Sequence, residues 1–478
     1  TGVFLRAAFS RLIECGLCPD AAVASLHGID IEECGVDMCA FVLLVDWLLA
    51  RGQRTRGPVE PLWRAIRQRL ICADSLAILD GVTTTATLFA HENDIPSWSR
   101  NGFTVMLGNP PYARLGDRKD LTWLGERYSC LADPSMSTDL YLPFVELLCS
   151  QLRSGGVGAM VVPMSIGYGT GHALRRLRET TGVVGGKWIF EFFDRTPDAL
   201  FGDDVKQRTA IISRVATHEN KVITGPIMRW TSRNREKLFK LIPTVDMGTF
   251  SIAAGVPKVG TDTQGSALIQ LRARAECLGD DLVTAKRLVP PFKSSSDTKI
   301  YVAGTAYNWL SIYRNGPAVT TNAKDPSTSS VLELDFEDSR TADASYALLS
   351  SRLVYWLWRV EGDAFHVPSG WVSGIPISLK NLGPITVDRL ASLGIHLWSK
   401  IVEQPVFSVN GGRTTLSYCP HSQPELLKAI DAELIQALGL PFDLGDELAR
   451  FVRELTVAGR LSISEHGLKR ALASWKET

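Results

Sequence analysis

The sequence from residue 103 to residue 112, Phe-Thr-Val-Met-Leu-Gly-Asn-Pro-Pro-Tyr, joins a short apolar run to a polar turn stiffened by two prolines. Residues 103–107 predict a short apolar β-strand, since such a run bounded by turn signals is consistent with one. Pro110 and Pro111 prevent the chain from entering a helix, because proline has a fixed φ and no backbone N–H. The stretch therefore predicts a strand that ends in a rigid polar loop.

This loop carries two hydrogen-bond acceptors and one ring. The side-chain oxygen of Asn109 and the carbonyl of Pro110 are acceptors at a fixed separation, so each can accept one hydrogen of an NH₂ group. The nitrogen lone pair is then directed toward an electrophile. Tyr112 offers a ring on which an extruded base can stack. Asn109, Pro110 and Tyr112 are therefore the candidate catalytic residues for transfer to an exocyclic amine. The alternative is a rigid loop followed by a packing aromatic.

Outward from this stretch, strand-like and helix-like segments alternate over residues 1–215. This alternation is typical of an α/β fold with a mostly parallel sheet covered on both faces. The expected strands are 23–31, 70–73, 103–107, 157–162, 188–193 and 209–215. The expected helices are 4–13, 36–49, 139 to about 155, and 172–180, with two more at 424–438 and 446–457.

Composition indicates a soluble globular protein. The 478 residues are 45% hydrophobic and 21% charged, and 51 basic side chains balance 51 acidic ones. A histone-like polycation is excluded, although a neutral chain can still carry a local basic face. The longest apolar runs fall short of the ~20 residues that span a bilayer, and no basic-then-apolar leader opens the sequence. We expect a cytoplasmic protein of about three structural units.

Nine cysteines, an odd number, argue against a secreted disulfide framework. The spacing of Cys15, Cys18, Cys34 and Cys39 permits a four-thiolate zinc site. Cys39 lies inside an apolar run, however, and no glycine-rich knuckle surrounds either pair. We expect buried thiols and no metal.

Further motifs stand around residues 109–112 in a fixed order. They are Thr1-Gly-Val-Phe-Leu5, His27-Gly-Ile-Asp-Ile31, Ile71-Cys-Ala-Asp-Ser-Leu76, Asp139-Leu-Tyr141 with Val161-Val-Pro163, and Ala199-Leu-Phe-Gly-Asp-Asp-Val205. The ordered set resembles the gamma-type adenine-specific (N6) DNA methyltransferases, which include the catalytic halves of type IIG restriction-modification enzymes. The resemblance covers residues 1 to about 215 and implies a Rossmann-like methyltransferase sheet.

The resemblance implies S-adenosyl-L-methionine as cofactor and a flipped adenine of double-stranded DNA as acceptor, within a restriction-modification or phage-defence system. The residues it assigns to the cofactor are Thr1, Gly2, Phe4, Asp30 and Asp74. Asp30 is the strand-end acid that would hold the ribose hydroxyls, and Asp74 would accept from the adenine amine of the cofactor. Phe201 would pack against the extruded base. Helix caps at both acids and a plain core role for Phe201 are the alternatives.

The opening motif departs from the family pattern, because its acidic and Cys-Gly half is absent along with the strand before it. The loss of a central strand leaves its two neighbours without ladder partners. We therefore expect a fragment of a longer reading frame, or a partner of a separately encoded methyltransferase or endonuclease segment. Such a chain would expose a hydrophobic slot and be poorly stable and inactive alone. A DNA-binding specificity subunit with a vestigial core is the alternative.

Residues 1–220 are thus expected to be the methyltransferase core, 221–420 an α+β target-recognition domain, and 421–478 a helical tail. The basic residues expected to contact DNA phosphates are Arg229, Arg233, Arg235 and Lys237, with a solvated helix face as the alternative. Residues 353–359 and 362–367 resemble a segment of such specificity regions, although 353–359 equally suits a buried aromatic helix. A recognition region this long favours DNA over RNA or a protein glutamine as acceptor.

Overall fold

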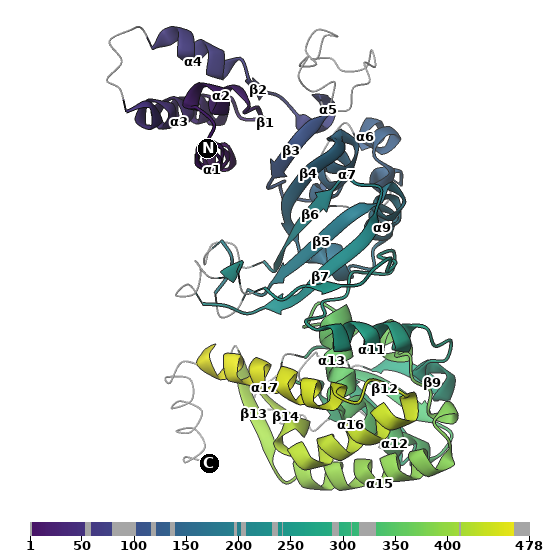
Figure 1. Ribbon diagram of the computed structural model, residues 1–478. Coiled ribbons are helices and arrows are strands. Elements are labelled where there is room, and N and C mark those ends of the chain that lie inside the picture. Colours follow the sequence, from purple (N-terminus) through teal and green to yellow (C-terminus); the bar gives the residue numbers. More distant parts are fainter. Residues whose placement is uncertain are drawn as a thin grey trace.

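The computed structural model describes residues 2–52, 59–78, 102–115, 121–133, 139–195, 198–201, 207–231, 238–240, 242–288, 296–306, 308–314, 331–410 and 413–462. Figure 1 shows an N-terminal helical part at the top, a twisted sheet with its helices in the middle, and a mixed part below that ends in the C-terminal helices. No helix in these ranges is both long enough and apolar enough to cross a membrane.

The N-terminal part is a small helical unit around one strand pair. Its elements are α1 (Val3–Glu14), α2 (Pro19–Ala24), β1 (Gly28–Asp30), α3 (Glu33–Arg51), α4 (Glu60–Arg67) and β2 (Leu70–Cys72). The strand expected over 23–31 is shorter, because Pro19 at the first helical turn starts α2, which includes Val23. β1 and β2 pair in parallel. Gly2 has φ 70°, and a Cβ there would collide with the Cys39 thiol, so this position needs glycine.

The middle part is one six-stranded sheet in the order β3-β4-β6-β5-β7-β8. The strands are β3 (Phe103–Gly108), β4 (Leu152–Pro163), β5 (Gly186–Phe193), β6 (Thr209–Val215), β7 (Asn220–Met228) and β8 (Val245–Asp246). The expectation of a mostly parallel sheet is wrong, since β6 runs antiparallel to both β4 and β5. An antiparallel neighbour needs no crossover helix, so the chain returns from β5 directly. The sheet continues through β7 and β8, past residue 220.

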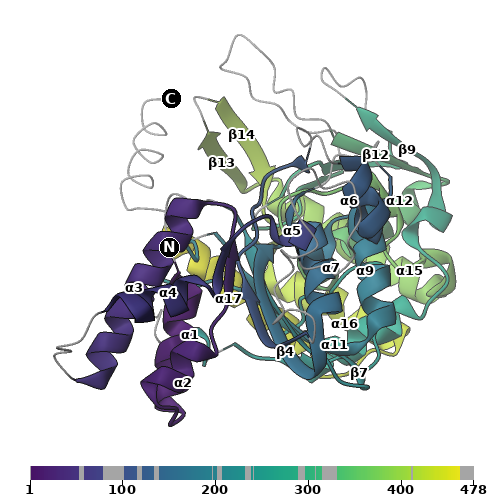
Figure 2. The ribbon, with the colours of Figure 1, turned by 90° about the horizontal axis from the view of Figure 1, so that it is seen from above.

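Helices cover one face of this sheet. They include α7 (Tyr141–Gln151) and α9 (His172–Val184), and seen from above these lie on the opposite side of the sheet from α1–α4 (Figure 2). Short helices complete the layer: α5 (Ser75–Ile78), α6 (Leu121–Arg127), η4 (Ser129–Leu131) and α8 (Ser165–Tyr168). Leu148, Leu177 and Ile212 are fully buried in the resulting core. The amphipathic helices thus fix which sheet face is interior.

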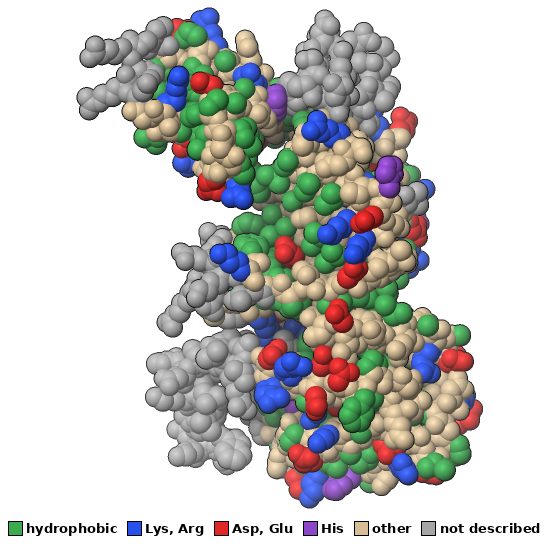
Figure 3. Space-filling model, viewed as in Figure 1, with side chains coloured by type: hydrophobic (Ala, Val, Ile, Leu, Met, Phe, Trp, Pro, Cys, Tyr) green, Lys and Arg blue, Asp and Glu red, His purple; other side chains and the backbone are tan. Residues whose placement is uncertain are grey.

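The other face is not fully covered, unlike the two-sided covering that the sequence pattern predicts. Val105, Leu107 and Val157 are 58%, 45% and 41% exposed, and Figure 3 shows hydrophobic side chains gathered over β3 and β4. Within the described ranges, no strand pairs with the outer edge of β3. The outer edge of β3 is therefore open in the described part of the chain, beside exposed apolar side chains.

The lower part contains an antiparallel sheet in the order β11-β10-β12-β9, and it is α+β as expected. Its strands are β9 (Leu282–Leu288), β10 (Lys299–Ala303), β11 (Ile312–Tyr313) and β12 (Val331–Phe336), with a separate hairpin β13 (Pro405–Asn410) and β14 (Arg413–Tyr418). Its helices are α11 (Asp262–Arg272), α12 (Ser339–Ser350), α13 (Arg352–Glu361), α14 (Ser369–Ser373) and α15 (Pro384–Ile401), with η6 (Leu278–Asp281) and η7 (Leu379–Asn381).

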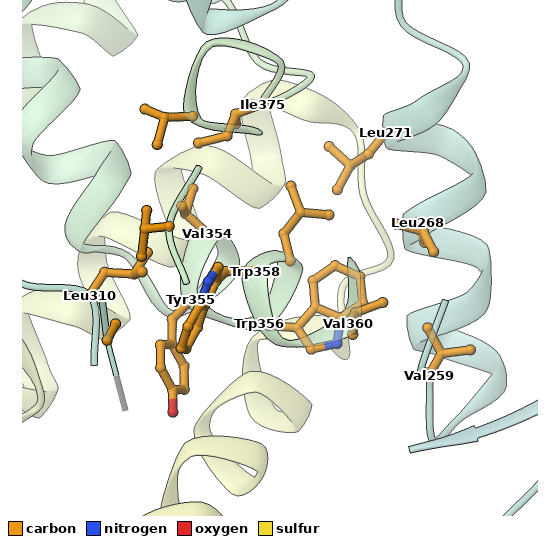
Figure 4. Close-up of a cluster of buried hydrophobic side chains, with 14 of the residues drawn as sticks. Val259, Leu268, Leu271, Leu310, Val354, Tyr355, Trp356, Trp358, Val360 and Ile375 are labelled. Atoms are coloured by element: carbon orange, nitrogen blue, oxygen red, sulfur yellow. The ribbon is translucent and has the colours of Figure 1, made fainter. Parts of the chain in front are cut away.

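Helix α13 is the centre of the lower core. Trp356 and Trp358 have no exposed surface, and Figure 4 shows both between Leu268 of α11 and Leu310 on the opposite side. A helix that is apolar on nearly every face must be interior. The buried-helix interpretation of residues 353–359 is therefore the one that the structure supports.

The C-terminal helices belong to the same body. They are α16 (Pro424–Leu438) and α17 (Leu444–Ser462), which follow η8 (Pro420–Ser422). The Arg274 guanidinium donates to the carbonyl of Leu438 at 2.6 Å, and the Thr263 hydroxyl donates to Asp443 at 2.7 Å. These bonds attach the helical tail to the start of the lower part.

Candidate active site

The Asn-Pro-Pro-Tyr loop leaves the sheet at the carboxyl end of β3. Asn109 is exposed and Pro110 is buried, so the buried ring anchors the loop while the amide stays accessible. Tyr112 is half-buried, and its hydroxyl has no hydrogen-bond partner in the part of the chain that the structure describes. Burial raises the pKa of Tyr112 to about 12. The loop therefore presents an acceptor amide beside a neutral aromatic ring.

The next motif folds back onto this loop. The backbone N–H of Leu140 donates to the carbonyl of Ala113 at 2.8 Å, and Arg114 and Asp139 form a β-bridge. The hydroxyls of Tyr141 and Ser165 lie 2.9 Å apart, which ties the start of α7 to the segment after β4. The structure thus brings the segment after Tyr112 into contact with the Asp139-Leu-Tyr141 motif that follows it in the sequence.

A buried ion-pair cluster follows along the same sheet edge. Asp194, just after β5, accepts from Arg208 at 2.9 Å and from Arg229 at 3.0 Å, while Arg359 of α13 lies 3.9 Å away. Burial acts to raise the pKa of Asp194, but the three guanidinium groups outweigh it and lower that pKa. The cluster joins the six-stranded sheet to the lower part.

This cluster changes the interpretation of Arg229. Its side chain is only 10% exposed and pairs with Asp194, which leaves little of it for a DNA phosphate. The other three residues of the expected phosphate-binding set, Arg233, Arg235 and Lys237, lie outside the described residues. The phosphate contacts remain a prediction for those three.

Phe201 lies beyond the end of β5. It is 40% exposed, while its neighbour Leu200 is buried with Phe193 and Trp230. The Phe201 side chain is thus accessible beside a buried neighbour, and a plain core role does not describe it. Packing against an extruded base stays a prediction, and residues 202–205 of the same motif lie outside the described residues.

The two acids assigned to the cofactor both bind backbone locally. The Asp30 carboxylate accepts from the N–H of Glu32 at 3.0 Å, and Asp74 accepts from the N–H of Leu76 at 3.0 Å. The Asp74 contact is the helix cap that the sequence left as an alternative, because α5 begins at Ser75, whereas the Asp30 contact is a local turn before α3, whose first turn has no side-chain cap. Because β1 and β2 are parallel and Asp30 pairs with Cys72, both acids lie at the same edge of the strand pair. Carboxylates at a strand edge suit ribose hydroxyls and an amine.

The other cofactor candidates lie at the start of α1. Gly2 caps the helix, Phe4 is 40% exposed, and Thr1 lies outside the described residues. β1 and β3 belong to separate sheets, so Asp30 and Asn109 do not share one sheet. Asp74 is linked to the middle part, since Leu76 is buried there and the Tyr128 hydroxyl donates to its carbonyl at 2.8 Å.

The cysteines form no metal centre in the described ranges. Cys15, Cys18 and Cys34 are exposed and Cys39 is buried. No three histidine, cysteine, aspartate or glutamate side chains in those ranges are grouped as metal ligands. Buried thiols were expected at all four positions, so that expectation is wrong for the three exposed ones.

Sequence reasoning missed Asp194, Lys258 and Arg359. Asp194 had a readable signal, because an acid directly after a buried strand is typical of a sheet-edge site. Lys258 and Arg359 had none, since Lys258 interacts with Glu361 and Arg359 with Asp194, which are both distant in the chain.

The family model of the Eco57I restriction-modification methylases matches residues 24–182. No curated protein sequence matches the chain. Among solved structures, the type IIL restriction-modification enzyme MmeI in complex with DNA is 12% identical with a TM-score of 0.49, covering 95% of this chain and 75% of that one. A DrdV–DNA complex is 11% identical with a TM-score of 0.44, over 95% and 64%.

The nuclease-deletion mutant of the type ISP enzyme LlaGI, in complex with a DNA substrate mimic, is 11% identical with a TM-score of 0.48, over 95% and 53%. The chain thus spans less than two thirds of the length of DrdV and of LlaGI. The matched range includes Asp30, Asp74, the Asn-Pro-Pro-Tyr loop and β4. Residues 24–182 of this chain are thus similar to the Eco57I restriction-modification methylases.

Proposed function

We propose that this methylase transfers a methyl group from S-adenosyl-L-methionine to the exocyclic N6 of an extruded adenine in double-stranded DNA. The observation that carries the proposal is the loop at the end of β3, where exposed Asn109 is anchored by buried Pro110 beside the Tyr112 ring. Side-chain and backbone oxygens at this spacing suit the two hydrogens of an amine.

The residues of the loop have separate roles in this proposal. Asn109 and Pro110 accept from the amine and orient the lone pair of N6, while Tyr112 stacks on the base. Phe201, exposed at the same edge, packs on the base from a second direction. Bound S-adenosyl-L-methionine would supply an electrophilic methyl group. Asp30 and Asp74 would hold its ribose and its adenine amine.

A base paired in a duplex is not accessible to such a loop, so the duplex must be held while the base is extruded. We assign that task to the lower part and retain target recognition as its role. MmeI, DrdV and LlaGI were each solved with DNA or a DNA mimic, which supports DNA as the partner. A restriction-modification or phage-defence setting and a cytoplasmic location complete the proposal.

The test is Asn109→Ala, assayed by transfer of labelled methyl groups to duplex DNA. Loss of one preorganised polar group of this kind costs about 10²–10³ in rate, and digestion of the product should yield N6-methyladenine. Asn381→Ala, at an exposed position of η7, is the matched control. Unchanged transfer by Asn109→Ala, or a product methylated at another atom, would remove the assignment.

A specificity subunit with a vestigial core is the second candidate. It is favoured by one observation, the separation of β1-β2 from the six-stranded sheet. Calorimetric titration with S-adenosyl-L-methionine distinguishes a working methyltransferase core from a vestigial one. In a working core, Asp30→Ala and Asp74→Ala should each weaken binding by roughly 1.5–3 kcal/mol, whereas a vestigial core binds DNA but no cofactor.

A further inference from the structure

The loop between α13 and α14 holds an unusual backbone conformation. It follows Glu361 and reads Gly-Asp-Ala-Phe-His-Val over residues 362–367. Ala364 has φ 59°, and among the described residues it is the one non-glycine with positive φ. Side chains other than glycine rarely adopt this conformation, and where it persists the surroundings must enforce it.

Asp363 enforces much of that geometry. One carboxylate oxygen accepts from the backbone N–H groups of Phe365 at 2.8 Å and His366 at 2.7 Å. The other lies 2.5 Å from Nδ1 of the His366 ring. Asp363 is 12% exposed and His366 is 64% exposed. A mostly buried carboxylate thus orients a ring that faces outward.

The body of the lower part fixes the same loop from behind. Trp358 Nε1 donates to the carbonyl of His366 at 2.8 Å. The N–H of Ala306 donates to the carbonyl of Phe365 at 2.7 Å, and the N–H of Val367 donates to that of Gly304 at 2.9 Å. The exposed imidazole is therefore rigidly held, unlike an ordinary surface histidine.

The loop lies against the catalytic edge of the six-stranded sheet. Arg208, directly before β6, donates to the carbonyl of Asp363 at 2.8 Å. β6 is two strands from β3, which at ~4.8 Å per strand is about 10 Å from the Asn109 loop. That distance equals about three base steps along a strand of DNA at ~3.4 Å each. The loop that holds His366 thus contacts the same edge of the sheet from which the Asn109 loop emerges.

The His366 ring has one nitrogen, Nε2, that can contact a DNA phosphate. Nδ1 is engaged by Asp363, and across the described ranges no other protein group binds Nε2. A protonated imidazole donates from both nitrogens, and a carboxylate partner at one of them directs the other outward. A phosphate oxygen is the acceptor that DNA offers most often at positions that carry no sequence information.

We propose that His366, oriented by Asp363, donates from Nε2 to a backbone phosphate of the DNA next to the target base. The inference rests on the proposed function and adds a contact from the lower part to it. His366 touches DNA in this proposal, and Asp363 is a positioning residue.

The test measures the affinity of the full chain for a mixed-sequence duplex over a salt series, because a phosphate contact does not depend on sequence. His366→Ala should weaken binding roughly tenfold, and the slope of log K against log salt should become shallower by ~0.9. His366→Gln keeps a neutral donor, so part of the affinity should return while the slope stays shallow. His396→Ala, at an exposed position on α15, is the matched control and should leave both quantities unchanged.

Asp363→Asn tests the positioning role. The amide oxygen can still accept from the two backbone N–H groups, but the amide nitrogen cannot accept from Nδ1, so affinity should fall while the fold is kept. Equal affinity and equal slope for wild type and His366→Ala would overturn this inference alone. Absence of duplex binding by the wild-type chain would overturn the proposed function with it.

Discussion

Lys258 is the buried cation whose replacement tests the electrostatics of the junction between the sheet and α13. Its side chain is 2% exposed, and Nζ has no hydrogen-bond partner in the described residues. Nζ lies 5.9 Å from the ring centroid of Tyr168 and 5.7 Å from that of Phe192, while the backbone N–H donates to Val360 at 3.0 Å. Lys258→Met keeps an unbranched chain against both rings and removes the charge.

Burial lowers the pKa of Lys258 from 10.5 to about 7. Between these two pH values the unfolded chain holds a proton that the folded protein has released, so wild-type stability rises with pH across the window. At ~1.4 kcal/mol per pH unit, the window corresponds to about 5 kcal/mol. Lys258→Met lacks this dependence. The free energy of unfolding of Lys258→Met minus that of wild type should therefore be about 5 kcal/mol larger at pH 7 than at pH 10.5.

Urea unfolding followed by tryptophan fluorescence, at points across this window, measures the difference. Lys428→Met, an exposed position on α16, is the matched control and should follow the wild-type curve. Parallel curves for wild type and Lys258→Met would refute the reasoning, because they would mean that the ammonium is solvated or paired in the folded protein.

Replacement of two buried carboxylates by amides should change the stability of the folded protein in opposite directions. Burial raises the pKa of Asp431 from 3.8 to about 7, so the folded protein holds an extra proton in that window and wild-type stability falls as pH rises through it. Asp431→Asn keeps an acceptor for the N–H groups of Arg352 and Leu353 and should raise the urea midpoint above pH 7 but not below pH 3.8. Asp194→Asn should instead destabilise by about 3–5 kcal/mol in calorimetry, since it leaves buried arginines without their partner. Asp246→Asn, which breaks an exposed pair with Lys221, should cost less than ~1 kcal/mol, and equal losses for the two variants would contradict this view of the cluster.

Local chemistry explains why the strand and the stiff Asn-Pro-Pro-Tyr loop after it could be predicted. Two prolines fix the backbone of residues 110–111 whatever surrounds them, and the apolar run before them becomes β3 as expected. Pro424–Leu438 was predicted at its observed bounds for a similar reason, because Pro424 starts the helix and Gly439, at φ 66°, ends it.

Long-range geometry explains what could not be predicted. Arg229 stands at the start of a basic run, and its partner Asp194 is 35 residues earlier in the chain, so the sequence suggested a phosphate contact where the structure has an ion pair. The direction of β6 was equally hidden, because an apolar strand has the same pattern in parallel and antiparallel neighbours. Val23 was assigned to a strand since periodicity over so few residues does not separate a strand from a short helix.

The arrangement of the two sheets has a consequence for cofactor binding. Asp30 lies on the strand pair and Asn109 on the six-stranded sheet, and the link described between them runs through β2, Asp74 and the buried Leu76. A ligand held by both acids therefore bridges the N-terminal part to the segment that packs on the middle part. A ligand that binds the folded state alone stabilises it by RT ln(1 + [L]/Kd), about 2.7 kcal/mol at a hundredfold excess over Kd. The stabilisation should spread from α1 to α7 in hydrogen exchange if the acids bind one molecule together, and should stay within one part if only one of them binds it.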